Sequence, residues 1–127
     1  MNKPIRITLA TITGVVLWGV VWNVFTFAGM ALFPDQVAPN EAITSVGILI
    51  AYLVISVPVS VLAGFAGAKV GADHAMTVNK VLPVVLFAIG AFVEFSYWDL
   101  MPVWYHIIFL LMIIPAAMKG GQMAGGE

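Results

Sequence analysis

Four apolar segments separated by short polar stretches make up most of this 127-residue chain. At the ~1.5 Å rise of an α-helix, each segment covers most or all of the ~30 Å hydrocarbon layer of a bilayer. The pattern predicts transmembrane helices over residues 7–33, 43–68, 81–98 and 102–118, followed by a glycine-rich tail over residues 119–127. We therefore expect an all-α, polytopic integral membrane protein, a four-helix bundle that forms a single transmembrane domain over residues 1–127.

Basic side chains predict the orientation of these segments. All five lie near alternate ends of the predicted helices, namely Lys3, Arg6, Lys69, Lys80 and Lys119. Because Lys and Arg collect on the cytoplasmic side of membrane proteins, this distribution predicts four crossings with both termini cytoplasmic. The stretch 34–41 carries acids and no base, as a loop on the outer side would.

Composition agrees with a membrane protein and excludes several functions. Hydrophobic residues make up 62% of the chain, charged residues only 9%, and the mean hydropathy is +1.07. A folded domain outside the membrane has no room in so short and apolar a chain. The net charge of −1 argues against a nucleic-acid partner, and the absence of cysteine excludes disulfides and thiolate chemistry.

Small residues recur every fourth position along the second segment, at Ser56, Ser60, Gly64 and Ala68. This spacing places them on one face of a helix, and small residues let the backbones of two membrane helices approach closely. We interpret the stripe as a helix-packing surface. A substrate path beside the kink expected at Pro58 is the alternative.

Few strongly polar residues fall inside the predicted spans, where a charge is costly. Glu94 and His106 lie at similar depths on either side of the tight turn between the third and fourth segments. The pair can join the two helices through a hydrogen bond or handle a proton, ion or substrate, or Glu94 can extend to the nearby interface. Further members of this candidate intramembrane polar network are Asn23, which we expect to turn inward and clamp two helices, and Tyr97, Tyr105 and Asp99.

Motifs of catalysis and metal binding are missing from the sequence. We find no activated nucleophile, no metal-ligand spacing and no phosphate-binding glycine loop. His106 is the only histidine within the predicted spans, so a bis-histidine haem would need a ligand from another subunit. We expect neither enzymatic activity, nor a metal site, nor a cofactor.

The segment around Pro102, with Trp104, Tyr105 and His106, has the pattern Pro-x-Trp-Tyr-His. In this last quarter the chain resembles small bacterial four-helix inner-membrane proteins of unassigned function. The resemblance implies a place in the bacterial inner (cytoplasmic) membrane and implies no particular activity, cofactor or site.

Two functions fit these features. The first is a non-catalytic accessory or assembly subunit, whose partners are the lipid bilayer and other transmembrane subunits, or further copies of itself. The second is a small homo-oligomeric transporter or ion or proton conduit that uses Glu94, His106 and Asn23. We favour the subunit because the sequence offers so few polar groups within the membrane.

Overall fold

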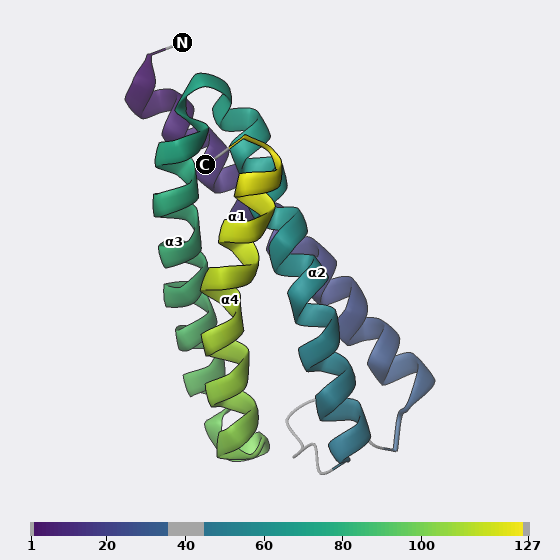
Figure 1. The fold of residues 1–127 in the computed structure, drawn as a ribbon. Coiled ribbons are helices and arrows are strands. Elements are labelled where there is room, and N and C mark those ends of the chain that lie inside the picture. Colours follow the sequence, from purple (N-terminus) through teal and green to yellow (C-terminus); the bar gives the residue numbers. More distant parts are fainter. Residues whose placement is uncertain (1, 36–44, 126–127) are drawn as a thin grey trace.

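Antiparallel helices form nearly all of the described chain, residues 2–35 and 45–125, in this computed structural model (Figure 1). The elements are α1 (Lys3–Leu32), α2 (Val46–Gly71), the 3₁₀ turn η1 (Ala72–His74), α3 (Ala75–Ser96), the 3₁₀ turn η2 (Trp98–Leu100) and α4 (Val103–Met123). Within these ranges there is no strand. The prediction of an all-α protein is confirmed.

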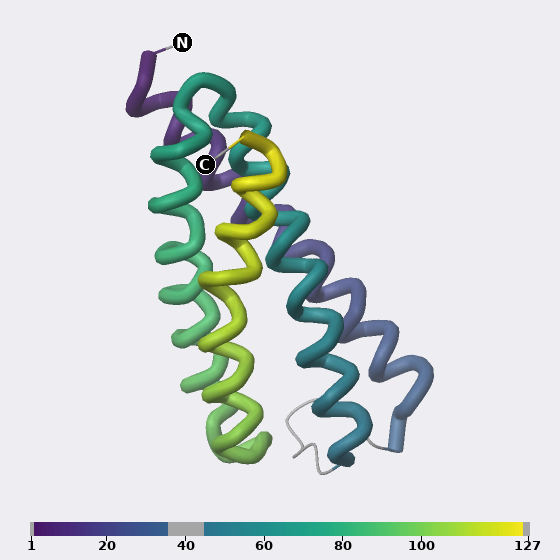
Figure 2. Tube along the Cα trace, in the orientation of Figure 1, coloured from purple at the N-terminus to yellow at the C-terminus, as the bar shows by residue number. Residues whose placement is uncertain are grey.

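Three continuous helical segments of the described chain are long and apolar enough to cross a membrane: Lys3–Leu32, Val46–Ser96 and Val103–Met123. The count is three and not the predicted four because the 3₁₀ turn η1 joins α2 and α3 without a break, as one helical segment of 51 residues. The polar stretch from Lys69 to Lys80, expected to be a loop, extends both helices because most of its residues are compatible with helix. The chain nevertheless turns back at η1, so that α2 and α3 run in opposite directions (Figure 2).

The reversal between α2 and α3 takes very few residues. Ala72 caps the C-terminus of α2 with a φ of 51° and donates its backbone N–H to carbonyl oxygens of the last turn. This conformation is unusual for a residue with a side chain and allows the chain to turn within η1. Because α3 begins at Ala75, Pro83 lies well inside this helix.

The C-terminal end of α4 differs from the prediction as well. The helix continues to Met123, so the first part of the predicted tail, 119–127, is helical. Glycine disfavours a helix interior, but Gly120 and Gly121 are buried there against other helices. Their missing side chains allow the close packing that holds this part of the chain in the helix.

The helices do not pack equally on one another. α4 lies against α2 and α3, whereas α1 lies mainly against α2. Figures 1 and 2 show α3 and α4 side by side. At the end of the bundle that contains the α3–α4 turn, α1 and α2 diverge from these two helices. Both ends of the described chain and η1 lie at the other end of the bundle, which therefore also carries the basic residues.

Apolar side chains cover both the inside and the outside of the bundle. The interior contains Trp18, Leu49, Leu82 and Phe109, each almost completely buried. Large apolar side chains are also exposed on every α-helix, among them Phe92, which is 75% exposed. Water would not stabilise such a surface, whereas the hydrocarbon layer of a membrane would.

Candidate functional site

Glu94 and His106 meet inside the hairpin of α3 and α4. Glu94 lies in the last turn of α3 and His106 in the first turn of α4, and they are only 4% and 0% exposed. Nδ1 of His106 lies in hydrogen-bonding contact with Oε2 of Glu94. Nε2 of the same ring lies 3.0 Å from the backbone carbonyl oxygen of Trp98 in η2. Three points of the hairpin are thus tied together by one imidazole.

The partners of His106 restrict where its protons can be. A carbonyl oxygen only accepts hydrogen bonds, so Nε2 must carry a proton and donate it to Trp98. One further proton then lies between Nδ1 and Oε2, either on the ring, opposite a carboxylate, or on the carboxyl group, opposite a neutral ring. In both arrangements Glu94 and His106 together carry no net charge. An additional or a missing proton would leave two donors or two acceptors facing each other, which is unfavourable at a buried site.

Aromatic rings surround this pair. The indole of Trp98 stacks on the imidazole of His106, with ring centroids 4.5 Å apart and planes at 10°. Tyr105 presents its ring to His106 at 76° and a centroid distance of 6.0 Å, and it stacks on Phe109 deeper in the bundle. Both Tyr105 and Phe109 are 1% exposed. These rings keep water from the pair and so strengthen its hydrogen bonds.

Of the six residues predicted for the polar network, the structure brings three together: Glu94, His106 and Tyr105. Tyr97 and Asp99 are exposed at the turn and take no part in it. The N-cap of α4 is Pro102, without a side-chain hydrogen bond.

Asn23 does not clamp two helices of this chain, and its predicted inward orientation is wrong. The residue is exposed on α1, and its amide nitrogen donates to the carbonyl oxygen of Gly19 in the same helix, at 2.7 Å. The opposite side of α1 faces inward, where Trp18 and Trp22 contact Phe109. Burying two indole rings removes more apolar surface than burying one amide, and this decides the rotation of the helix.

One buried hydrogen bond and one buried polar side chain were not predicted. Trp18 donates its indole N–H to the hydroxyl of Ser60 in α2, at 3.3 Å, and thereby links the first two helices inside the core. Asn79 of α3 is only 6% exposed and lies beside Gly121 of α4. Ser60 belongs to the predicted stripe, which could have pointed to the first contact. Asn79 was assigned to a loop, so its burial had no signal in the sequence.

The predicted stripe on α2 lies on the buried side of that helix. Ser56, Ser60, Gly64 and Ala68 are all buried. A Cβ atom on Gly64 would overlap the backbone carbonyl of Ala117 in α4, and one on Gly120 of α4 would overlap the carbonyl of Val61 in α2. The backbones of α2 and α4 therefore touch at two glycines, one from each helix. The sequence indicated Gly64 but not Gly120.

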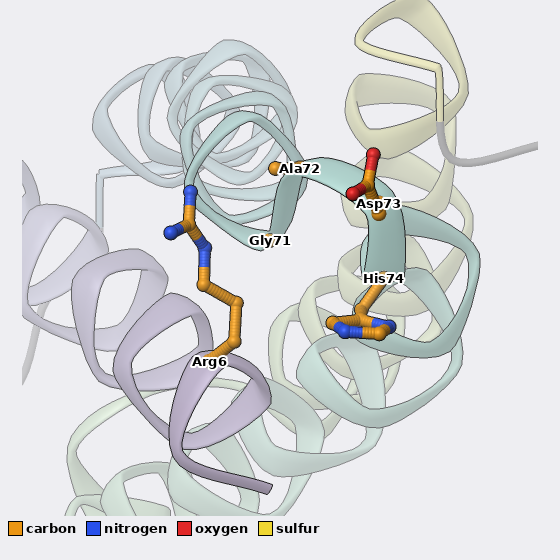
Figure 3. A pocket seen from close by; sticks show the side chains of 5 residues that line it. All are labelled: Arg6, Gly71, Ala72, Asp73 and His74. Carbon is orange, nitrogen blue, oxygen red and sulfur yellow. The ribbon is translucent and has the colours of Figure 1, made fainter. Parts of the chain in front are cut away.

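A shallow polar hollow of about 310 Å³ opens at the end of the bundle that carries the basic residues (Figure 3). It is lined by Arg6 and the backbone and side chains of residues 71–74, including Asp73 and His74. Nε of Arg6 donates to the carbonyl oxygen of Val70, one of the last carbonyls of α2. A cation at a helix C-terminus stabilises that helix, so Arg6 has a structural role here. No three potential metal ligands among His, Cys, Asp and Glu come together within residues 2–35 and 45–125.

Comparison with known proteins adds no relative. The chain matches no protein-family model, no curated protein and no solved structure. The resemblance of its last quarter to small bacterial membrane proteins stays a prediction.

Proposed function

We propose that this protein is a non-catalytic integral membrane protein of the bacterial inner membrane, an accessory or assembly subunit that acts by packing against other transmembrane chains. In this proposal α1, α2, α3 and α4 each cross the bilayer, with both termini on the cytoplasmic side. The accumulation of all five basic residues toward one end of the bundle supports this orientation.

One observation carries the proposal: three buried polar side chains, Glu94, His106 and Ser60, join helices of the same chain. Glu94 and His106 connect α3 with α4, and Ser60 connects α2 with α1. A side chain that is enclosed by its own helices and already hydrogen-bonded has little capacity left for a substrate. What the molecule offers to its surroundings is its apolar helix faces, and contact is the function that such faces serve.

The alternative, a homo-oligomeric conduit, has less support. Its proposed lining residues would have to face a shared axis, but Glu94 and His106 lie 4% and 0% exposed inside one copy. Asn23 is exposed, yet it lies on α1, away from the α3–α4 hairpin that holds the other two. The three residues therefore do not share a surface.

Affinity purification from the native membrane tests the proposal. The chain, tagged at one terminus and extracted in a mild detergent, should copurify with another transmembrane protein, or with further copies of itself, at a fixed stoichiometry. Gly19→Ile should leave the fold intact, because a Cβ atom at this position meets no atom within 4 Å, and it tests whether partner contacts are made through α1. Recovery of the isolated single chain after gentle extraction and cross-linking would contradict a subunit role.

A flux measurement tests the alternative. Glu94→Gln retains a hydrogen bond to His106 but carries no exchangeable acidic proton, so we expect folding and assembly nearly as in the wild type. If the protein conducts protons, proteoliposomes with the wild type should show a pH-driven flux that the variant lacks. Equal flux with both proteins, at the level of empty vesicles, is the expected result for a subunit.

A further inference from the structure

The outer face of α1 contains one strongly polar residue in an apolar surface. Asn23 is exposed, and its neighbours on this face are Val16, Val20 and Phe27, which are 56%, 57% and 67% exposed. Asn23 lies in the C-terminal half of a helix that is long enough to cross a bilayer. In a membrane, this amide would face hydrocarbon, where it loses the hydrogen bonds that water would give.

The hydrogen bonds of Asn23 are only partly satisfied within this chain. One N–H donates to the carbonyl oxygen of Gly19. Elsewhere in the described chain the second N–H finds no acceptor and the side-chain oxygen finds no donor. One turn away, a Cβ atom built on Gly19 meets no atom within 4 Å, so the surface there is open to another helix. An unsatisfied amide thus lies beside a place where a second backbone can approach closely.

We propose that this outer face of α1, formed by Val16, Gly19, Val20, Asn23 and Phe27, binds the same face of a second copy of the chain. The two Asn23 side chains are hydrogen-bonded to each other across a two-fold axis. The inference rests on the proposed function, because it requires membrane insertion with one orientation for all copies, and it names a partner for that function.

Symmetry is the reason for choosing a second copy over another protein. Copies inserted in the same orientation can be related by a two-fold axis along the membrane normal, and each residue then meets its equivalent at equal depth. A carboxamide carries both a donor and an acceptor, so two of them can satisfy each other reciprocally. A different protein would have to offer a matching group at this depth, whereas a second copy provides it automatically.

Cysteine cross-linking tests the contact, and the chain has no cysteine of its own. Val16→Cys lies two turns from Asn23 on the same face, so oxidation in native membranes should yield a disulfide-linked dimer. Leu111→Cys on α4 is a matched control, because Leu111 is 68% exposed but lies on another helix. We expect a dimer from the first variant and little from the second.

Substitutions of Asn23 and Gly19 test the chemistry of the contact. Asn23→Leu removes the amide pair, and we expect the dissociation constant of the dimer, measured by sedimentation equilibrium in density-matched detergent, to rise about fivefold. Asn23→Gln keeps a carboxamide and should restore part of the affinity. Gly19→Ile should weaken the dimer while the monomer stays as stable as before, because a Cβ atom at this position meets no atom within 4 Å.

Several outcomes would overturn the inference. They are equal cross-linking of the Val16→Cys and Leu111→Cys variants, an unchanged dissociation constant in Asn23→Leu, or a Val16→Cys adduct with a different protein. The last result would leave the subunit role standing and refute only self-association through α1. Failure of the chain to remain with membranes after alkaline extraction would instead refute the proposed function itself.

Discussion

α4 is held on its two sides by different forces. Toward α3 it is tied by a buried hydrogen-bonded pair, Glu94 with His106, which also reaches the backbone of η2. Toward α2 it is held by close packing, because Gly64 and Gly120 allow the two backbones to touch. The first interface depends on matching donors with acceptors, and the second depends on the absence of side chains.

The difference shows how each interface fails. A polar pair that loses one partner leaves a buried group without a hydrogen bond, which costs more than the pair contributes when intact. A glycine contact fails by overlap, because atoms added between two backbones push the helices apart. Each interface can therefore be broken separately while the other is left intact.

The largest expected effect comes from breaking the polar pair on one side only. His106→Leu leaves the Glu94 carboxyl group buried and unpaired, and we expect it to lower the free energy of unfolding by about 3–5 kcal/mol. Unfolding in mixed micelles titrated with dodecyl sulfate measures this loss. The double variant Glu94→Leu with His106→Leu should recover most of the stability, since neither partner is then left alone. A double variant as unstable as the single one would show that the packing of these side chains, and not their hydrogen bond, stabilises the α3–α4 interface.

Gly64→Leu tests the close packing of α4 on α2. The new side chain has to displace the backbone of α4 at Ala117, and we expect a loss of about 1–3 kcal/mol in the same titration. Gly19→Leu is the matched control, because the space around Gly19 is open. Similar stabilities for the two variants would refute the close approach of α2 and α4.

A smaller effect is expected where α1 joins the bundle. Ser60→Ala removes the acceptor of the Trp18 indole and should lower stability by about 1 kcal/mol. Ser56→Ala provides the comparison, because the hydroxyl of Ser56 donates to the Leu53 carbonyl of its own helix and links no second helix. If both substitutions lower the free energy of unfolding by the same amount, the contact between Trp18 and Ser60 does not stabilise the pairing of α1 with α2.

The smallest effect should come from the end that carries the basic residues. Arg6→Gln removes the charge that interacts with the C-terminal carbonyls of α2, and we expect a loss of about 0.3–1 kcal/mol that decreases as salt is added. Lys3→Gln, at an exposed position of the same helix, is the control and should change little. A loss independent of salt would assign the role of Arg6 to its packing and not to its charge.

The sequence was sufficient for the parts of the fold that depend on apolar length and spacing. The all-helical fold, the face of α2 that packs and the approach of Glu94 to His106 across a tight turn all follow from such patterns. Helix ends were less predictable. The turn after α2 uses a rare backbone conformation at Ala72, and α4 continues through two glycines because their burial compensates for their poor helix propensity.

Only the tertiary structure decided which side of each helix is buried where the sequence offered two choices. On α1, the sequence favoured the side with Asn23 as the inner face, but packing buried the aromatic side with Trp18 instead. The contact of His106 with the backbone carbonyl of Trp98 in η2 could not be predicted either, because every residue has such a carbonyl whatever its side chain. Spacing along one helix fixes which residues share a face, but the rotation of that helix is set by the shape of its neighbours, and that information is distributed over the whole bundle.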